Sequence, residues 1–193
     1  FPTRRSSDLL KDDMWGYNRY TKQTVNIGSA FLQNEWKNEK WSILLGGRLD
    51  KHNLINHVIF SPRANLRFNP SEDINLRLSY SSGFRAPQAF DEDLHIENVG
   101  GTVSMIERAK NLKEEKSQSF SASADMYHRF GAFQVNFLVE GFYTRLSDVF
   151  VLENIGERDG ILIKERRNGS GAKVLGLSME GKMAYLSLFQ LRS

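Results

Sequence analysis

A short acidic segment holds the densest group of potential ligand-contacting side chains in the sequence. Residues 91–95 (DEDLH) place three carboxylates and one imidazole within five positions, directly after an aromatic residue. Carboxylate oxygens suit hard cations, so the segment could contact a cation or a bound ligand. The alternative is a solvated surface loop, which is favoured because calcium-loop spacing is missing, and no metal site is predicted. The candidate contact residues are Phe90, Asp91, Glu92, Asp93 and His95.

A second group of charged residues recurs inside apolar stretches, always on the polar side of an alternating pattern. Guanidinium groups suit bidentate contacts with carboxylates, so the arginines at 63, 67 and 77 could hold an anionic partner. The alternative is pairing with acids on the same face, such as Asp125 or Glu140. The candidates on this polar face are Arg48, Arg63, Arg77, Asp125, Glu140, Glu180 and Lys182.

Neither group forms a catalytic arrangement. The sequence has no Gly-x-Ser-x-Gly, phosphate-binding loop or His-Glu-x-x-His motif. The spacing of Ser82, His52 and His95 does not support a serine–histidine pair at the rim of a barrel enzyme. The histidines at 52, 57 and 95 are interpreted as ordinary surface-loop residues, and neither enzymatic activity nor a cofactor is predicted.

The elements that must position these charges are β-strands, because apolar and polar residues alternate with period two. In residues 74–81, Ile74, Leu76, Leu78 and Tyr80 alternate with polar side chains. Seven such segments predict seven strands, most of about 10–14 residues. The segments lie within residues 25–31, 41–50, 58–68, 74–81, 119–126, 133–143 and 175–183. Pro62 interrupts one of them and predicts a bulge.

The connections alternate in length. Residues 37–40, 69–73 and 130–132 are tight turns, whereas residues 51–57, 85–116 and 154–160 are longer. An up-and-down transmembrane barrel has this asymmetry, with short turns on one side and displayed loops on the other. The longer connections are therefore predicted to carry recognition. Residues 157–160 (ERDG) read as a hairpin turn.

The same alternation fits a soluble or surface β-sandwich that binds glycans, so that class stays open. Full charges in the middle of strands favour the barrel, because a sandwich core could not hold them unpaired whereas a wet lumen can. Aromatic residues near strand ends, such as Trp36 and Trp41, suit the membrane interface. A passive porin is the third candidate. The formal net charge of +3 is small and scattered, so no nucleic-acid partner is expected.

Four segments resemble the barrel of TonB-dependent outer-membrane receptors. They are residues 46–53 (GGRLDKHN), 60–95 (FSPRANLRFNPSEDINLRLSYSSGFRAPQAFDEDLH), 111–120 (NLKEEKSQSF) and 171–181 (GAKVLGLSMEG). The Gly-Phe-Arg-Ala-Pro run after an alternating strand is the most specific of them. Glu114 departs from the pattern, since the family usually has proline there.

The resemblance implies an all-β, antiparallel up-and-down transmembrane barrel, of which this chain supplies about seven of 22 strands. It further implies a location in the cell outer membrane, lipid around the barrel, and a bulky ligand such as a siderophore, haem, cobalamin or an oligosaccharide. A small-molecule metal chelate or cobalamin-type ligand is favoured. Import would be driven through the TonB complex by way of an N-terminal plug, which this sequence does not contain. The polar-face residues would then line the lumen or contact the plug.

The first residues follow a different pattern. Residues 1–9 (FPTRRSSDL) resemble the translation of a sequencing-library adapter, and we interpret them as an artefact. The alternative is a natural basic, serine-rich linker. Residues 10–193 are then expected to be a fragment of the barrel domain, truncated at both ends.

Overall fold

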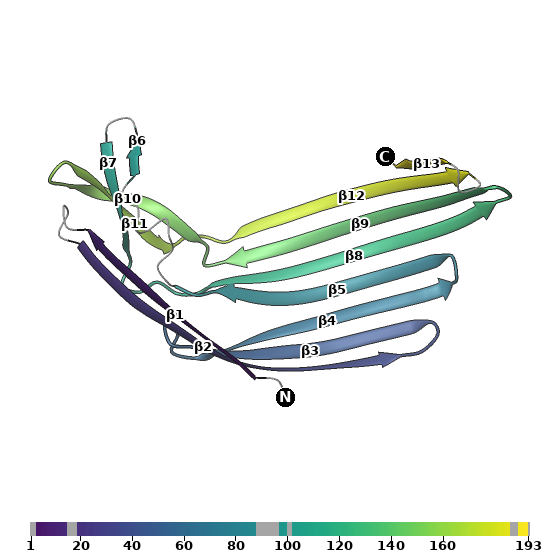
Figure 1. Cartoon of the computed structure of the whole chain (residues 1–193), viewed down its shortest axis with the longest axis horizontal. Helices are drawn as coiled ribbons and strands as arrows, with labels where there is room; N and C mark the ends of the chain where they lie inside the picture. Colours follow the sequence, from purple (N-terminus) through teal and green to yellow (C-terminus); the bar gives the residue numbers. More distant parts are fainter. Residues whose placement is uncertain (1–2, 15–18, 88–96, 100–101, 186–188, 193) are drawn as a thin grey trace.

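A computed structural model shows that the chain is built from β-strands, arranged as one long antiparallel sheet and one small mixed sheet (Figure 1). The structure describes residues 3–14, 19–87, 97–99, 102–185 and 189–192. Within them, no helix is long and apolar enough to cross a membrane. The expected all-β, antiparallel architecture is confirmed, and the sheet is an unclosed part of a barrel.

The long sheet contains nine of the described strands, in the order β1-β2-β3-β4-β5-β8-β9-β12-β13. Each neighbouring pair is antiparallel. The seven predicted segments all fall within strands of this sheet, at β2, β3, β4, β5, β8, β9 and β12. The bounds are β1 (Thr3–Met14), β2 (Arg19–Lys37), β3 (Trp41–His52), β4 (Val58–Ser71), β5 (Ile74–Arg85), β8 (Glu115–Phe130), β9 (Phe133–Ser147), β12 (Ala172–Tyr185) and β13 (Phe189–Arg192).

The two ends of the long sheet differ as the connection lengths predict. Tight turns join β2 to β3, β4 to β5 and β8 to β9 at one end, on the right in Figure 1. The longer connections lie at the opposite end, which we call the loop end. Two of them contain strands of their own, which the sequence analysis did not anticipate. These strands are β6 (Glu97–Val99), β7 (Thr102–Arg108), β10 (Phe150–Arg158) and β11 (Ile161–Asn168).

The small sheet joins the two longest connections across a large sequence separation. Its order is β10-β11-β7-β6, and β11 pairs with β7 in parallel. The predicted hairpin turn is confirmed, because Asp159 and Gly160 both have positive φ values, 54° and 78°, between β10 and β11. Two successive residues with positive φ form the turn that matches the twist of a two-residue hairpin.

Cross-strand register assigns every strand residue to one of two faces of the long sheet. Directly opposed residues in an antiparallel pair share a face. One row follows Ile43, Leu66, Leu78, Ala122, Gly141 and Leu177, and is apolar throughout. The neighbouring row on the other face follows Ser42, Arg67, Arg77, Ser123, Glu140 and Ser178. The sheet thus has one apolar face and one polar face, as a barrel wall requires.

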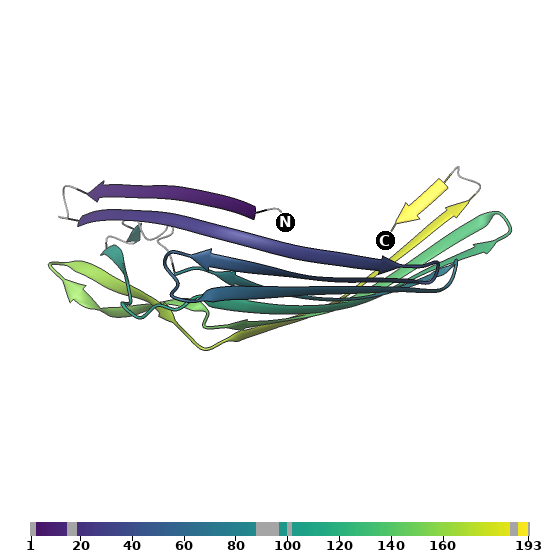
Figure 2. The ribbon, with the colours of Figure 1, turned by 90° about the horizontal axis from the view of Figure 1, so that it is seen from below.

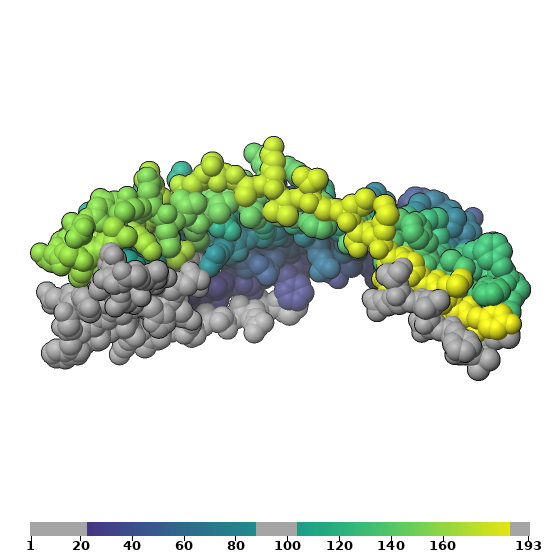
Figure 3. All heavy atoms as spheres, turned by 90° about the horizontal axis from the view of Figure 1, so that it is seen from above, coloured from purple at the N-terminus to yellow at the C-terminus, as the bar shows by residue number. Residues whose placement is uncertain are grey.

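The curvature of the sheet distinguishes the two faces further. Figures 2 and 3 show the sheet from below and above, bent along its length into an arch. Large apolar side chains stay exposed on the apolar face, with Leu78 at 54% and Leu177 at 66%. Asp50 and Ser61 on the polar face are buried, at 2% and 8%. This contrast is expected when the apolar face is convex towards lipid and the polar face lines the lumen.

Aromatic rings gather on the apolar face near the tight turns. The Trp41 ring stacks on Phe68 at a centroid distance of 4.0 Å, and Phe133 packs against Tyr185 at 4.8 Å. Towards the loop end, Tyr80 lies 4.7 Å from Phe120. Amphipathic aromatic side chains favour the two membrane interfaces, so these groups delimit an apolar band between them.

The bulge predicted at Pro62 is wrong. The β3–β4 register runs without a shift through the pair Gly47 and Pro62. The shift in β4 lies instead between Phe68 and Ser71, and the ladder to β5 begins at Arg63. Proline has no N–H to donate, and here it stands just beyond the end of the ladder with β5, where none is required.

The register predicts opposite outcomes for two neighbouring substitutions in a complete barrel. Leu78 lies on the lipid face near the middle of β5, so Leu78→Arg is expected to cost about 2–4 kcal/mol and reduce the folded fraction. Arg77→Gln changes the lumen face and is expected to assemble normally. Heat-dependent gel mobility of outer-membrane fractions measures both. Equal damage from the two substitutions would contradict the register, since a shift of one residue exchanges the faces.

Candidate functional site

The polar face carries all seven charged residues predicted to line the lumen. Arg48, Arg63, Arg77, Asp125, Glu140, Glu180 and Lys182 lie on this face by register. Their role in contacting a plug or a ligand stays a prediction.

Some of these charged side chains have a partner within the sheet. Arg48 Nε donates to Asp50 Oδ2 at 2.7 Å, and Lys182 Nζ lies 3.2 Å from Glu180 Oε1. Asp125 accepts a hydrogen bond from Asn136 Nδ2 at 2.5 Å. These pairs fix the side chains along the wall, because each holds its charge beside a cross-strand or same-strand neighbour.

Three arginines on the polar face have no such partner. Arg67 and Arg77 are directly opposed on β4 and β5, and Arg63 lies on the same face of β4. Among the described residues, no ion pair joins any of the three to an acid, and the buried Arg67 Nε has no hydrogen-bond partner. Like charges placed directly opposite each other are destabilising. The predicted alternative, pairing with Asp125 or Glu140, does not occur in the described residues.

Hydroxyl groups occupy the rows beside these arginines. Ser79 and Ser121 share a hydrogen bond of 2.7 Å between β5 and β8, and Ser119 bonds Thr144 at 2.9 Å between β8 and β9. Because these hydroxyl side chains are short, water can reach the polar face beside the three arginines. The arrangement can bind carboxylates or an anionic ligand by charge and hydrogen bonding, since guanidinium offers a fork of donors.

At the loop end, three side chains tie the long connections to the barrel wall. Glu114 Oε1 lies 3.0 Å from Lys116 Nζ and 3.2 Å from His57 Nε2, so it links the β3–β4 loop to the start of β8. Glu115 Oε2 accepts from the backbone N–H of Phe150 at 3.0 Å. Asn168 Nδ2 donates to the carbonyls of Lys113 and Asp148, and its Oδ1 accepts from the Lys113 N–H.

Among the described acids at the loop end, the Glu114 carboxyl has the most contacts with basic side chains. Its side chain is 8% exposed, whereas those of His57 and Lys116 are about half exposed. Burial alone raises its pKa, but a backbone hydrogen bond, Lys116 and His57 together outweigh burial. The pKa of Glu114 therefore lies below its ordinary value, and the carboxylate stays charged at neutral pH.

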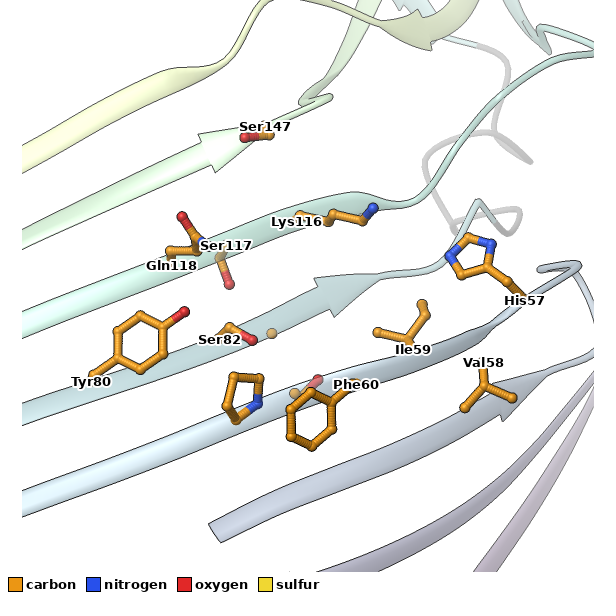
Figure 4. Close-up of a pocket in the computed structure, with 13 residues that line it drawn as sticks. His57, Val58, Ile59, Phe60, Tyr80, Ser82, Lys116, Ser117, Gln118 and Ser147 are labelled. Atoms are coloured by element: carbon orange, nitrogen blue, oxygen red, sulfur yellow. The ribbon is translucent and has the colours of Figure 1, made fainter. Parts of the chain in front are cut away.

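A cleft opens beside this cluster, where the β4–β5 ladder has ended. Figure 4 shows His57 and Lys116 at one end of the cleft and Tyr80 at the other. Its volume is about 460 Å³, and Ser82, Ser117 and Gln118 contribute polar groups. The cleft lies where strands β4 and β5 are no longer paired, beyond Arg63 and Ser81, and Pro62 is one of its lining residues.

The structure places the remaining predicted residues as follows. Phe90, Asp91, Glu92, Asp93 and His95 lie outside the described residues, so their predicted contacts stay predictions. The interpretation of His52 as a surface-loop residue is wrong, because it ends β3 and is 0% exposed, with Nδ1 accepting from the Leu54 N–H. In the described residues, no cluster of three or more His, Cys, Asp or Glu could hold a metal ion.

Sequence reasoning missed Asn168 and Glu115 as anchors of the loop end. Asn168 stands in an Asn-Gly-Ser triplet, and nothing in that triplet indicates that its amide binds distant backbone groups. Glu114 was visible only as a departure from a family pattern. A half-buried amide that bonds two segments 55 positions apart leaves no local signal.

Comparisons with solved structures identify proteins with the same fold. The chain superposes on the siderophore receptor PirA from Pseudomonas aeruginosa with a TM-score of 0.71 at 16% identity, covering 91% of this chain and 36% of that one. A mutant of the P. aeruginosa ferric enterobactin receptor PfeA gives 0.67 at 17%, covering 94% and 29%. The Serratia marcescens hemophore receptor HasR, in complex with HasA and heme, gives 0.66 at 14%, covering 84% and 32%.

These structures share the fold, and the chain spans about a third of their length. No curated protein sequence matches the chain significantly. The family described as "TonB dependent receptor-like, beta-barrel" matches residues 3–192. The match includes β1 and β13, so it extends over the whole of the long sheet. The chain belongs to the β-barrel family of TonB-dependent receptors.

Proposed function

We propose that this chain forms part of the wall of an outer-membrane receptor that imports a bulky ligand by energy-coupled transport. The observation that carries the proposal is the polar face with Arg63, Arg67 and Arg77 unpaired along a wall of the family's barrel. A wall that only had to enclose water would not need three adjacent cations without counterions. An inserted plug with acidic side chains, or an anionic ligand, would supply them.

The chemical class of the ligand is proposed by analogy. The solved structures of the same fold are described as receptors for siderophores, ferric enterobactin and a hemophore. A metal chelate fits the cationic wall, since siderophore complexes commonly carry negative charge that guanidinium groups can bind. The segment 90–95 would add contacts from the outer side. Residues 1–9 remain a proposed adapter artefact, and residues 10–193 a proposed fragment of the barrel domain.

The loop end is proposed as the outer, recognition side. Connections display function while strands hold the scaffold, and the two longest connections are here locked together by the β7–β11 pairing. Glu114, Glu115 and Asn168 then orient these connections relative to the barrel wall. A preorganised loop sheet loses less conformational entropy on binding than separate mobile loops would.

The experiment that tests the proposal measures uptake by the complete receptor in a strain lacking its own copy. Accumulation of radiolabelled ferric siderophore or haem is expected to require the receptor, and to stop when TonB is deleted or a protonophore is added. Uptake that continues without TonB would identify a passive porin and contradict the proposal. A gene product that partitions into the aqueous phase after detergent extraction would instead identify a soluble glycan-binding sheet.

Removing the unpaired cations should impair transport without impairing assembly. Arg67→Gln combined with Arg77→Gln leaves the lipid face unchanged, so heat-dependent gel mobility is expected to match the wild type. Uptake at limiting ligand concentration is expected to fall at least ten-fold, because the plug or ligand loses charge-assisted hydrogen bonds worth roughly 1.5 kcal/mol or more. The matched control is Lys37→Gln with Lys40→Gln at the tight-turn end. Unchanged uptake in the arginine variant would remove the proposed role.

The Glu114 contacts predict a pH dependence of loop order. A group whose pKa is lowered by folding stabilises the folded form above its ordinary pKa, and this contribution is lost as pH falls through the lowered pKa. The protection of the amides in residues 53–57 against hydrogen exchange, relative to the intrinsic exchange rate at each pH, is therefore expected to be high at pH 7 and to fall as the carboxyl protonates. Glu114→Gln should show low protection at pH 7 and little further change on acidification. A wild-type profile in the glutamine variant would contradict the anchoring role.

A further inference from the structure

Three stretches of chain that connect the long sheet to the small sheet are bonded to one another at the loop end, and we call them the neck. They are residues 109–114 between β7 and β8, residues 148–149 between β9 and β10, and residues 169–171 between β11 and β12. The Gly169 N–H donates to the Val149 carbonyl at 2.8 Å. The Ala109 N–H donates to the carbonyl of Arg166 in β11 at 3.0 Å. Because the small sheet lies beyond the neck (Figure 1), its position relative to the wall depends on what holds the neck together.

One side chain, that of Asn168 at the end of β11, bonds to both of the other stretches. Its Nδ2 donates to the carbonyls of Lys113 and Asp148, at 3.0 Å and 2.8 Å, and its Oδ1 accepts from the Lys113 N–H at 2.8 Å. A carboxamide has two N–H donors and a carbonyl acceptor, and here all of them have backbone partners. Asp148 has a positive φ of 54°, which is uncommon for a residue other than glycine, and the bond from Asn168 holds its carbonyl. Asn168 is therefore the anchor of the neck.

The backbone that follows Asn168 has little room to move. A Cβ added at Gly169 would lie 2.9 Å from Val151 Cγ1, and one added at Gly171 would overlap the Leu146 carbonyl oxygen. A larger residue at either position would displace these neighbours, so the packing of the neck favours glycine at both. The glycine directly after Asn168 is therefore a consequence of close packing, and it brings a chemical reactivity with it.

The sequence contains a single Asn-Gly step, and it is Asn168–Gly169. In such a step the deprotonated backbone nitrogen of the glycine can attack Cγ of the asparagine, because glycine has no side chain to hinder the approach. A bond forms between this nitrogen and Cγ, the bond from Cγ to Nδ2 breaks, and ammonia leaves. Water then opens the resulting succinimide ring to aspartate or isoaspartate. The net reaction consumes water and releases ammonia, so no other reactant is needed.

The intact neck opposes this reaction. The Gly169 N–H is held by the Val149 carbonyl, and three hydrogen bonds fix the Asn168 amide, so the attack requires a local opening of the neck. The product cannot restore the contacts, because a carboxylate has no N–H to donate to the Lys113 and Asp148 carbonyls. Its oxygens would face these carbonyl oxygens instead, and isoaspartate would also lengthen the main chain by one methylene group.

We propose that Asn168–Gly169 is a modification site, at which hydrolysis of the side-chain amide releases the small sheet from the barrel wall. The amide form holds the three stretches of the neck together, and the acid form lets them separate. Water is the only substrate, and the released ammonia is lost to solvent, so the change runs in one direction. The site does not depend on which ligand the receptor imports.

The first test follows the conversion of residue 168 in the complete wild-type receptor, without any transport assay. Detergent-purified receptor is incubated at mildly alkaline pH in isotopically labelled water, and mass spectrometry of its peptides measures the label in the new carboxylate. Conversion is expected to be at least roughly ten-fold slower in the folded receptor than in urea, because the attack waits for an opening that breaks three hydrogen bonds. Equal rates in the two forms would overturn the proposal.

The second test compares two asparagine-to-aspartate variants by hydrogen exchange in residues 109–114 and 148–150. Asn168→Asp is expected to lower protection at least roughly ten-fold, because its carboxylate cannot donate to either carbonyl. The matched control is Asn154→Asp in the small sheet. Among the described contacts, Asn154 uses only Oδ1, which accepts from the Gly156 N–H at 3.1 Å, so a carboxylate can replace it and protection should stay unchanged.

Protection in Asn168→Asp that equals the control overturns the proposal. If Asn168→Asp does not assemble, the same exchange measurement on wild-type receptor before and after conversion replaces it. Protection of the neck that is unchanged after most of residue 168 has been converted overturns the proposal in that case.

Discussion

The structure depends on one constraint: a backbone that crosses hydrocarbon must satisfy its N–H and C=O groups within the sheet. No water is available there, and each unsatisfied group costs several kcal/mol. The continuous antiparallel ladder from β1 to β13 meets this requirement along the strands. Two exceptions occur in the β4–β5 ladder, which begins only at Arg63, directly after Pro62, and in which the β4 register shifts after Phe68. Between Arg63 and Phe68 the two strands pair without interruption.

Once the hydrogen-bonded register of the strands is set, the pleat of the sheet determines which residues lie on each face. Residues that alternate along a strand point to opposite sides, so one sequence can meet lipid on one face and a wet lumen on the other. Arg77 and Leu78 are neighbours in sequence, but Arg77 faces the aqueous lumen and Leu78 faces lipid. The sheet is not closed, and a barrel removes the open edges that β1 and β13 leave. Register therefore links the local alternation of the sequence to the organisation of the whole wall.

The same physics explains what the sequence could predict. Residues 74–81 alternate perfectly, so the strand, its faces and the position of Arg77 all follow from period two. The Asp159–Gly160 turn was readable because only a few residue types tolerate its backbone angles. These features are local, and each is decided by neighbours a few positions apart.

The features that escaped prediction are non-local. The parallel pairing of β7 with β11 joins residues near 105 and 163. Neither segment has a sequence pattern that predicts which strand it pairs with. His52 reads as a loop residue in sequence, yet the strand continues to it and neighbouring residues cover it. Asn168 acts through backbone groups of two other segments. The face on which each strand residue lies therefore follows from the pattern, whereas the loop-end anchors required three-dimensional contacts.

The two faces carry different kinds of charge because one meets lipid headgroups and the other meets water. Acids on the lipid face would meet headgroups of their own sign, whereas cations at the interface can extend to anionic groups at small cost. On the lumen face both signs occur, because water and neighbouring side chains solvate them: Arg48 pairs with Asp50, and Lys182 with Glu180. Among the described residues, Arg63, Arg67 and Arg77 lie on this lumen face with no acid paired to them, so their charge is left to water or to a group that enters the lumen.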